Sequence, residues 1–253
     1  MTYPNNSAAN NSAANNSAVA AADDEYLRPT PYANSDHPIV VAKTEELTSA
    51  SSDVLVHLGN IYRYVRDIPY DILASFRYLA EGKSAASDVI EHDVAFCMGK
   101  ANTFVALCRA AKIPARVAFQ SLDAPEMEFL APEVRRMCGG RAGRPLPWHS
   151  LGEAFLHGRW IKLDATIDAP TAQRLGKPYT VEFDGRTDIP TVEGAVLRDN
   201  GSYADYPPQV AAWYMRLARE VLGALDSDID EQRVAADDRL WAGPDPDLVR
   251  LGR

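Results

Sequence analysis

The clearest hydrophobic pattern in this chain lies between residues 88 and 119. From Cys97 onward, small and apolar side chains recur every three to four residues, a spacing that places them on one buried face of a helix. These residues are Ala101, Phe104, Val105, Cys108 and Ala111. Pro114 ends the predicted helix, and the short apolar run Ala115–Phe119 is typical of a buried strand.

Two paired strands are predicted in the segment HSLGEAFLHGRWIKLDATID, which begins at His149. A tight turn at Gly158-Arg159 joins them. Because alternate residues of a strand face the same side, His149 and Asp164 share a face of this hairpin. A two-residue turn would place Asp164 opposite Glu153, about 13 Å along the strand from His149, so a bulge or a longer loop must close the gap.

Upstream of this core, the pattern predicts one strand and one helix. Prolines punctuate an extended arm over residues 23–43, in which Ile39–Ala42 is the expected strand. An amphipathic helix follows over residues 52–66, and one of the serines at its start is the expected cap. Residues 78–92 show no clear period, and we expect them to cross the surface.

Downstream, long Gly- and Pro-rich stretches separate the predicted elements. Residues 120–148 are predicted to be mainly a loop, with a short helix near residues 133–138. The loop ends at His149, and we expect it to form one wall or a lid of a cleft. Residues 170–206 are expected to wrap the core. The last predicted helix covers residues 208–225.

These elements divide the 253-residue chain into a tail, one domain and a second tail. Residues 1–22 repeat the motif NNSAA and are predicted to be disordered, since such a polar tract buries too little apolar surface. They lack the basic and apolar stretches of a secretory signal. The domain spans residues 23–225, and residues 226–253 form an acidic C-terminal tail.

Composition narrows the range of partners. The net charge of −9 argues against nucleic acid, because phosphate binding requires an excess of Lys and Arg. No run of eighteen apolar residues exists, so we expect no membrane partner. Three cysteines without a CxxC pair, and acidic residues without calcium-loop spacing, indicate no disulfide framework, metal or cofactor. A reducing, cytoplasmic location fits this cysteine content best.

Cys97 is the leading candidate for chemistry. At the first turn of a helix, backbone N–H groups favour a thiolate over a thiol, which suits a nucleophile. A buried, inert cysteine is the alternative interpretation. A nucleophilic thiol needs a base, for which His149 is the candidate, and a carboxylate that orients the base. Asp164 is favoured for that role, with Glu153 and Asp168 as alternatives.

These segments resemble the core of the transglutaminase-like superfamily. The resemblance rests on the helix FCMGKANTFVALCRAAKIPARV, a histidine before a strand, and GRWIKLDAT, and it extends over residues 53–188. It implies an α+β, papain-like fold with helices packed on an antiparallel sheet. It also implies that Cys97 is the nucleophile, His149 the general base and acid, and Asp164 the orienting residue.

The chain departs from animal transglutaminases in one respect. Its four tryptophans all follow Cys97, so the upstream tryptophan that assists the oxyanion there has no counterpart. We therefore do not expect calcium-dependent protein cross-linking. The predicted activity is cysteine-dependent acyl transfer or hydrolysis through a Cys97 thioester, on a small or carrier-bound acyl substrate. A cysteine peptidase or amidase, and a non-catalytic binding module, are the alternatives.

Substrate contacts are predicted next to His149. Trp148 precedes it, and Arg141 and Arg144 belong to the basic loop before it. Such arginines suit a carboxylate, a phosphate or the acidic surface of a carrier protein. A solvated, charged loop is the alternative interpretation.

Overall fold

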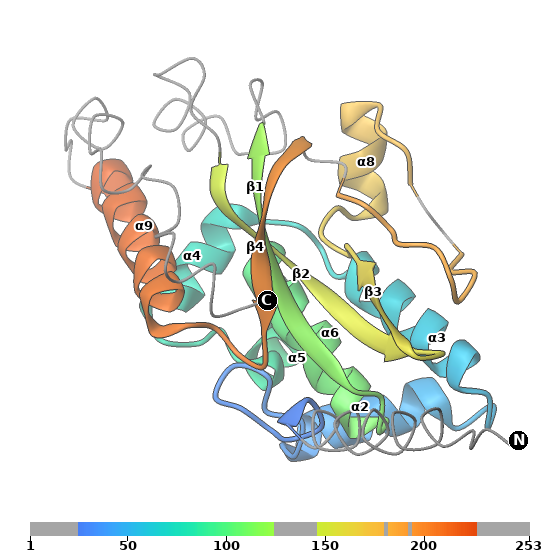
Figure 1. The fold of residues 1–253 in the computed structure, drawn as a ribbon. Helices are drawn as coiled ribbons and strands as arrows, with labels where there is room; N and C mark the ends of the chain where they lie inside the picture. Colours follow the sequence, from blue (N-terminus) through green and yellow to red (C-terminus); the bar gives the residue numbers. More distant parts are fainter. Residues whose placement is uncertain (1–24, 124–145, 180–181, 192–193, 227–253) are drawn as a thin grey trace, which may run out of the picture.

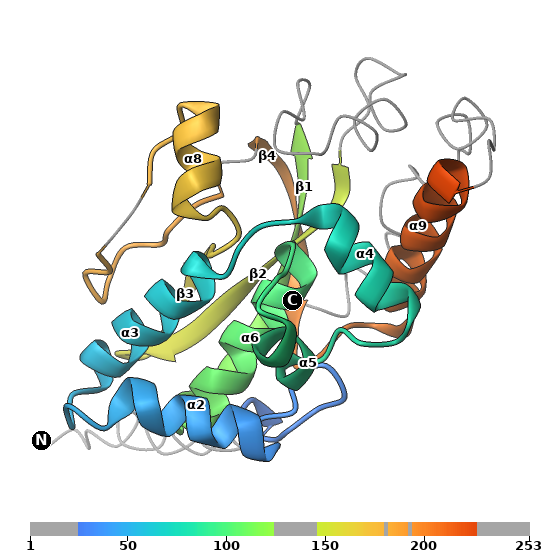
Figure 2. The ribbon, with the colours of Figure 1, turned by 180° about the vertical axis from the view of Figure 1, so that it is seen from behind.

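The structure, a computed structural model, describes residues 25–123, 146–179, 182–191 and 194–226. Four antiparallel strands form a curled sheet in the order β3-β2-β1-β4, and most of the helices lie on one side of it (Figures 1 and 2). The predicted α+β class, with helices packed on an antiparallel sheet, is confirmed.

The two inner strands of the sheet each pair with two neighbours. Strand β1 pairs with β2 on one side and with β4 on the other, and β3 extends the sheet beyond β2. The strands are β1 (Ala115–Asp123), β2 (Leu146–Leu156), β3 (Arg159–Leu163) and β4 (Ala195–Tyr203). Residues 170–206, expected to wrap the core, include strand β4, which was not predicted because its mixed polar sequence hides the strand pattern.

Helix α6 (Cys97–Ala110) is the central element; it starts at Cys97 as the pattern predicts and ends four residues before Pro114. Every residue from Cys97 to Arg109 is buried, because α6 packs on β1 and β2 and is flanked by other helices (Figure 2). The approach to β2 is close. A Cβ atom on Gly152 would lie 2.1 Å from Cδ1 of Phe104, so only glycine fits at this contact.

The other helices surround this centre. Helices α2, α3 and α5 pack against α6, while α9 packs against α4 (Figure 2). Their bounds are α2 (Pro38–Thr48), α3 (Val54–Asp67), α4 (Ile72–Ala80), α5 (Ala86–His92), α8 (Ala169–Leu175) and α9 (Pro208–Asp226). The predicted helix over residues 208–225 therefore corresponds to α9.

Helix α2 replaces the strand predicted at Ile39–Ala42. The prediction was wrong because a β-branched run was given more weight than its flanking residues. Pro38 occupies the first turn of the helix, and His37 caps it by accepting a hydrogen bond from the backbone N–H of Ile39. Only Val40 and Thr44, one turn apart, are buried, as expected for a helix that touches the core along one edge.

Residues 78–92, which show no clear period and were expected to cross the surface, contain the end of α4 and all of α5. Helix α4 buries Ile72, Phe76 and Leu79 at helical spacing, whereas α5 has seven residues, too few for a hydrophobic period to show. Side-chain caps mark where both helices begin. Asp71 accepts a hydrogen bond from the backbone N–H of Ala74 at 3.0 Å, and Asp88 accepts one from that of Ala85 at 2.9 Å.

Helix α3 confirms the predicted amphipathic helix, but its cap differs. Asp53 accepts a hydrogen bond from the backbone N–H of Leu55 at 2.9 Å, whereas Ser51 accepts one from that of Asp53. The two predicted tails, the short helix near residues 133–138 and most of the loop 120–148 lie outside the described residues.

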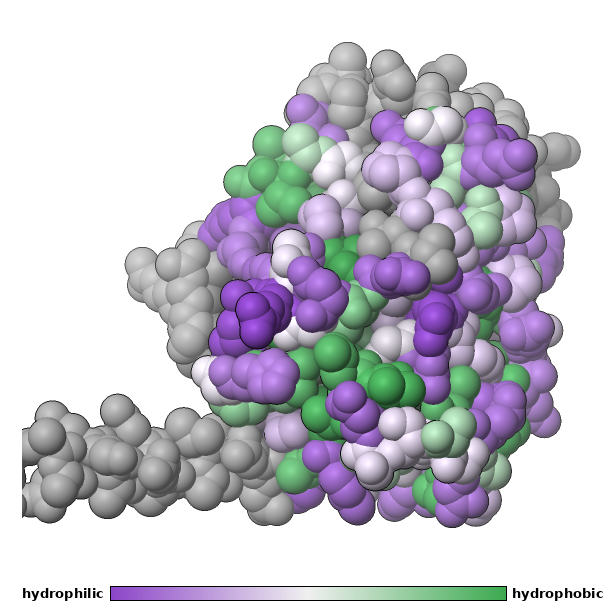
Figure 3. Space-filling model, turned by 90° about the vertical axis from the view of Figure 1, so that its right-hand side faces the viewer, coloured by the Kyte–Doolittle hydropathy of each residue, from purple (hydrophilic) through white to green (hydrophobic). Residues whose placement is uncertain are grey.

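The described surface is mixed in polarity. Seen from the right-hand side of Figure 1, it is largely polar, with apolar side chains gathered between polar ones (Figure 3). No helix of the described residues is both long and apolar enough to cross a membrane.

Candidate active site

Cys97 is the first residue of α6, and its side chain lies near the junction of α6, β2 and α9. The first N–H groups of a helix have no partner within it, so they are available to stabilise negative charge near the thiol. Cys97 is 7% exposed. Its Sγ atom lies 3.7 Å from the hydroxyl oxygen of Tyr214 in α9.

His149 and Asp164 form a direct, buried contact. Nε2 of His149 lies 2.6 Å from Oδ2 of Asp164, and the two side chains are 0% and 4% exposed. The other carboxylate oxygen, Oδ1, accepts a hydrogen bond from the backbone N–H of Thr166 at 2.8 Å. Both oxygens of Asp164 are therefore fixed, and the imidazole orientation is fixed with them.

The position of the hairpin turn brings these two residues together. Leu156 pairs with Arg159, so the turn is formed by His157 and Gly158, one residue earlier than predicted. Both turn residues have positive φ, at 52° and 81°, as a two-residue hairpin turn requires. Leu163 consequently pairs with Gly152, and Asp164 follows two residues nearer to His149 than predicted.

The alternative carboxylates have other partners. Glu153 Oε2 lies 2.5 Å from Nε of Arg116. Asp168 caps α8 by accepting a hydrogen bond from the backbone N–H of Thr171, and it accepts a second from that of Tyr70. Among the three candidates, Asp164 is the one that the structure brings to His149.

The charge state of the pair follows from these contacts. Burial by itself raises the pKa of Asp164, but His149 and the hydrogen bonds from Thr166 outweigh it, so the pKa lies below its usual range. Asp164 is thus a carboxylate at neutral pH and can only accept hydrogen bonds, which makes Nε2 of His149 the donor. In neutral imidazole, Nδ1 is then the nitrogen that can take a proton.

The strand that carries His149 and the helix that carries Cys97 meet at one hydroxyl group. Tyr214 donates a hydrogen bond to the backbone carbonyl of Trp148 at 2.8 Å, and its oxygen lies 3.3 Å from Oγ of Ser150. These two residues flank His149 in β2. The thiol therefore lies close to the backbone from which the imidazole projects.

A sequence model of the transglutaminase-like superfamily matches residues 41–165, a span that contains Cys97, His149 and Asp164. Residues 41–165 form a transglutaminase-like superfamily domain. None of the curated proteins compared with the chain matches it.

Two solved structures resemble the chain that contains this transglutaminase-like domain. A candidate cysteine protease from Cytophaga hutchinsonii is 22% identical, with a TM-score of 0.42, over 56% of this chain and 40% of that protein. A TGase is 16% identical, with a TM-score of 0.32, over 58% of this chain and 32% of that protein. The chain thus spans less than half the length of either protein.

The remaining predicted residues of the transglutaminase-like domain are placed as follows. Trp148 is 5% exposed and its ring packs edge-on against that of Phe119, so its substrate contact stays a prediction. Arg141 and Arg144 lie outside the described residues. Lys100, three residues after the thiol in α6, does not reach solvent, since it is 1% exposed.

Lys100 instead ties α6 to α3. Its ammonium group donates a hydrogen bond to the backbone carbonyl of Arg66 at 2.8 Å. Cys108 is fully buried in the core, as predicted, and burial raises the pKa of its thiol. Of the two described cysteines, Cys97 is thus the one placed for chemistry.

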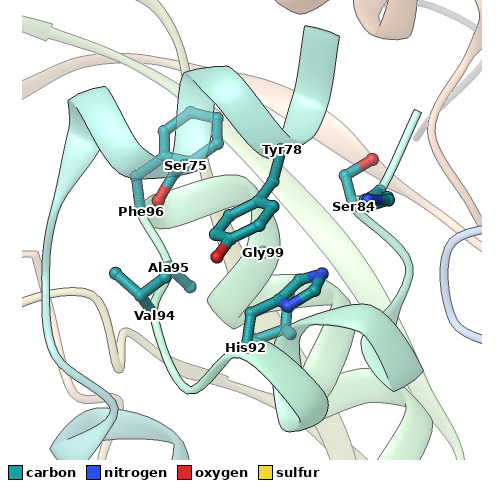
Figure 4. A pocket seen from close by; sticks show the side chains of 10 residues that line it. Ser75, Tyr78, Ser84, His92, Val94, Ala95, Phe96 and Gly99 are labelled. Atoms are coloured by element: carbon teal, nitrogen blue, oxygen red, sulfur yellow. The ribbon is translucent and has the colours of Figure 1, made fainter. Parts of the chain in front are cut away.

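A pocket lies beside the start of α6, where Figure 4 shows the ring of Tyr78 stacked on the imidazole of His92. The two ring centroids are 3.9 Å apart. The cavity volume is about 10 Å³, enough for about one water molecule, so it does not serve as a substrate cleft. His92, expected in a loop, is the last residue of α5.

A second small cavity adjoins Asp164 and is lined by Tyr62, Arg66 and Tyr179. Burial raises the pKa of Tyr62 to about 12, so its hydroxyl stays protonated at neutral pH. From the sequence, Tyr62 is either a core aromatic or a residue that reaches the cleft beside Cys97; its position beside Asp164 is seen only in the folded chain. Within the described part of the chain, no group of three or more His, Cys, Asp or Glu side chains is placed to hold a metal ion.

Proposed function

We propose that this protein is a cysteine-dependent acyl-transfer enzyme of the transglutaminase-like superfamily. The observation that carries the proposal is the buried contact between His149 and Asp164, at 2.6 Å, next to a helix that begins with Cys97. An ionised carboxylate holds one imidazole nitrogen as a donor and leaves the other as a base for a thiol. Superfamily membership supports the same assignment of roles.

In the proposed reaction, His149 takes the thiol proton and the sulfur of Cys97 attacks the acyl carbonyl carbon. The backbone N–H groups at the start of α6 stabilise the oxyanion. The bond to the leaving group then breaks, the leaving group takes the proton from His149, and a thioester with Cys97 remains. An incoming amine or water is deprotonated by His149 and releases the acyl group as an amide or an acid.

The acyl donor is proposed to be small or bound to a carrier protein. Amide synthesis or cyclisation results when an amine or an internal nucleophile accepts the acyl group, and peptidase or amidase activity results when water accepts it. The chemistry of Cys97 is the same in each case, because the thioester forms before the acceptor is chosen.

A test of the shared first step uses p-nitrophenyl acetate as an activated acyl probe. We expect intact-mass analysis to show one acetyl adduct, and peptide mapping to place it on Cys97. Cys97→Ala should abolish the adduct while leaving the melting temperature nearly unchanged. The control Cys108→Ala should retain the adduct, because that thiol lies in the core.

The second candidate is a non-catalytic binding module on the same fold. The observation that favours it is the low exposure of the thiol, since Cys97 is 7% exposed. Failure of the wild-type protein to form an adduct, or a large loss of stability in Cys97→Ala, would favour this candidate and overturn the enzymatic proposal.

A further inference from the structure

The Tyr214 side chain is a buried group near the thiol that the proposed reaction does not use. It belongs to α9, 117 residues downstream of Cys97, and is 2% exposed. Its ring packs edge-on against those of Phe96, the residue before the thiol, and Trp213. Aromatic packing therefore fixes the ring, and the hydroxyl position follows from it.

The hydroxyl group of Tyr214 contacts two separate elements at once. It lies 3.7 Å from Sγ of Cys97 in α6 and 2.8 Å from the carbonyl oxygen of Trp148 in β2. A third contact, at 3.3 Å, reaches Oγ of Ser150 in the same strand.

The direction of these hydrogen bonds follows from the number of protons available. A carbonyl oxygen can only accept, so the single hydroxyl proton of Tyr214 lies on the bond to Trp148. While Cys97 is a thiol, its S–H and the O–H of Ser150 can donate to the phenol oxygen; once the thiol proton has passed to His149, the phenol O–H is the group that can donate to the thiolate. Burial, followed by the nearby Cys97 and Tyr206, raises the pKa of Tyr214 well above its usual value, so this proton is retained.

We propose that Tyr214 is a positioning residue for the nucleophile, an inference that rests on the proposed function. Its hydroxyl group links the sulfur at the start of α6 to the backbone on both sides of His149. The link restricts rotation of the Cys97 side chain and holds the sulfur at a constant distance from β2. The thiol is thereby kept within reach of the imidazole that deprotonates it.

The test distinguishes two effects on the labelling rate of Cys97: deprotonation of the thiol by His149, and access of the reagent to the thiol. Iodoacetamide labelling of Cys97, followed by peptide mapping, is timed at about pH 7 and about pH 9.5. At the higher pH an ordinary thiol, with a pKa of about 8.5, ionises without a base, so the rate reports access alone. The ratio of the rate at about pH 7 to that at about pH 9.5 therefore reports assistance by His149.

Tyr214→Phe keeps the ring and removes the hydroxyl group. We expect this variant to lower the ratio by about threefold to tenfold, the amount that one hydrogen bond contributes. Ser150→Ala removes a second contact of the same hydroxyl and should lower the ratio in the same direction, by less. It provides the same test if Tyr214→Phe fails to fold.

Tyr203→Phe is the matched control. The ring of Tyr203 packs against Phe119, and its hydroxyl donates to the carbonyl of Asn200 in its own strand. This variant should leave the ratio unchanged. A variant that only loosens the packing or exposes the thiol changes the labelling rates at both pH values by the same factor. A ratio in Tyr214→Phe equal to that of the wild type would therefore overturn the inference.

The His149→Ala variant distinguishes failure of this inference from failure of the proposed function. If His149→Ala lowers the ratio and Tyr214→Phe does not, only the role of Tyr214 is overturned. If His149→Ala leaves the ratio unchanged, the pairing of thiol and imidazole is wrong, and both proposals are overturned. In the double variant we expect Tyr214→Phe to have no further effect, because the base that it helps is absent.

Discussion

At each end of the β2–β3 hairpin, a basic side chain of the hairpin contacts an acidic side chain, and the surroundings of the two pairs are opposite. At the end remote from the turn, His149 and Asp164 are 0% and 4% exposed and 2.6 Å apart. Beside the turn, Arg159 and Asp188 are 54% and 50% exposed and 3.1 Å apart. Water and salt weaken the exposed pair, whereas burial strengthens each contact of the inner pair. Placement in the fold, more than residue type, separates a candidate catalytic pair from a surface ion pair.

In the middle of the hairpin, the exposure of the paired side chains lies between the values at the two ends. Glu153 is almost fully buried and lies 2.5 Å from Arg116, with Lys162 at 3.9 Å. Lys162 also pairs with Asp199 in β4. The ion pairs of Glu153 connect β2 to β1 and β3. This carboxylate therefore stabilises the sheet, although it shares a face with His149.

The largest effect is expected at the buried end. Asp164→Asn removes the charge that stabilises the protonated imidazole and allows the wrong tautomer. We expect acetyl transfer from p-nitrophenyl acetate to Cys97 to slow by roughly 10³-fold, measured by intact mass against time. The control Asp168→Asn keeps the cap of α8 and should acylate at the wild-type rate. Equal losses in both variants would show that Asp164 has no special role.

A smaller effect is expected in the middle. Glu153→Gln should lower the free energy of unfolding by about 1–3 kcal/mol, because Arg116 loses the charge of its partner in a largely buried contact. Urea denaturation measures this change. The acylation rate should stay at the wild-type value. A slowed acylation in a folded Glu153→Gln protein would place Glu153 in the catalytic pair and contradict the comparison.

The buried pair also predicts a pH dependence of stability. Because the pKa of Asp164 is lowered in the folded chain, its contribution is present above the unfolded value of about 3.9 and is lost as the pH falls through the folded value. The difference in unfolding free energy between the wild type and Asp164→Asn should therefore shrink with acidification in that range. A constant difference across it would contradict the lowered pKa.

The smallest effect is expected beside the turn. Arg159→Gln should lower the free energy of unfolding by about 1 kcal/mol or less, since both partners are half exposed. Added salt should reduce the difference further, because ions screen surface charges. Urea titrations at low and high salt test this expectation. A loss of unfolding free energy as large as that of Glu153→Gln would contradict the contrast between buried and exposed ion pairs.

Several features of the fold could be predicted because they depend on local sequence. Helix α6 was found with its start correct and its end within a few residues, since its small and apolar residues keep one helical period and Pro114 follows. The seven-residue helix α5 could not be found in this way. Its start is marked by a capping contact of Asp88 with the backbone, which no period reveals.

The candidate site shows the same division. Cys97, His149 and Asp164 were singled out from a helix start and an alternating hairpin, but the distance between the last two was overestimated. One residue of difference in the turn moves each facing position by two residues, and sequence alone does not fix that choice between neighbouring turn positions. The contact of Tyr214 with Cys97 had no signal in the sequence.

The sequence by itself determined the helix that begins at Cys97 and the shared face of His149 and Asp164, and its resemblance to the transglutaminase-like superfamily implied the α+β class. The helix and the shared face depend on periods of 3.6 and two residues, which are properties of neighbouring positions. Only the tertiary structure decided which carboxylate meets His149, and that α9 brings a hydroxyl group to the thiol. Such contacts join residues far apart in the chain, and they depend on how whole elements pack, which no local pattern contains.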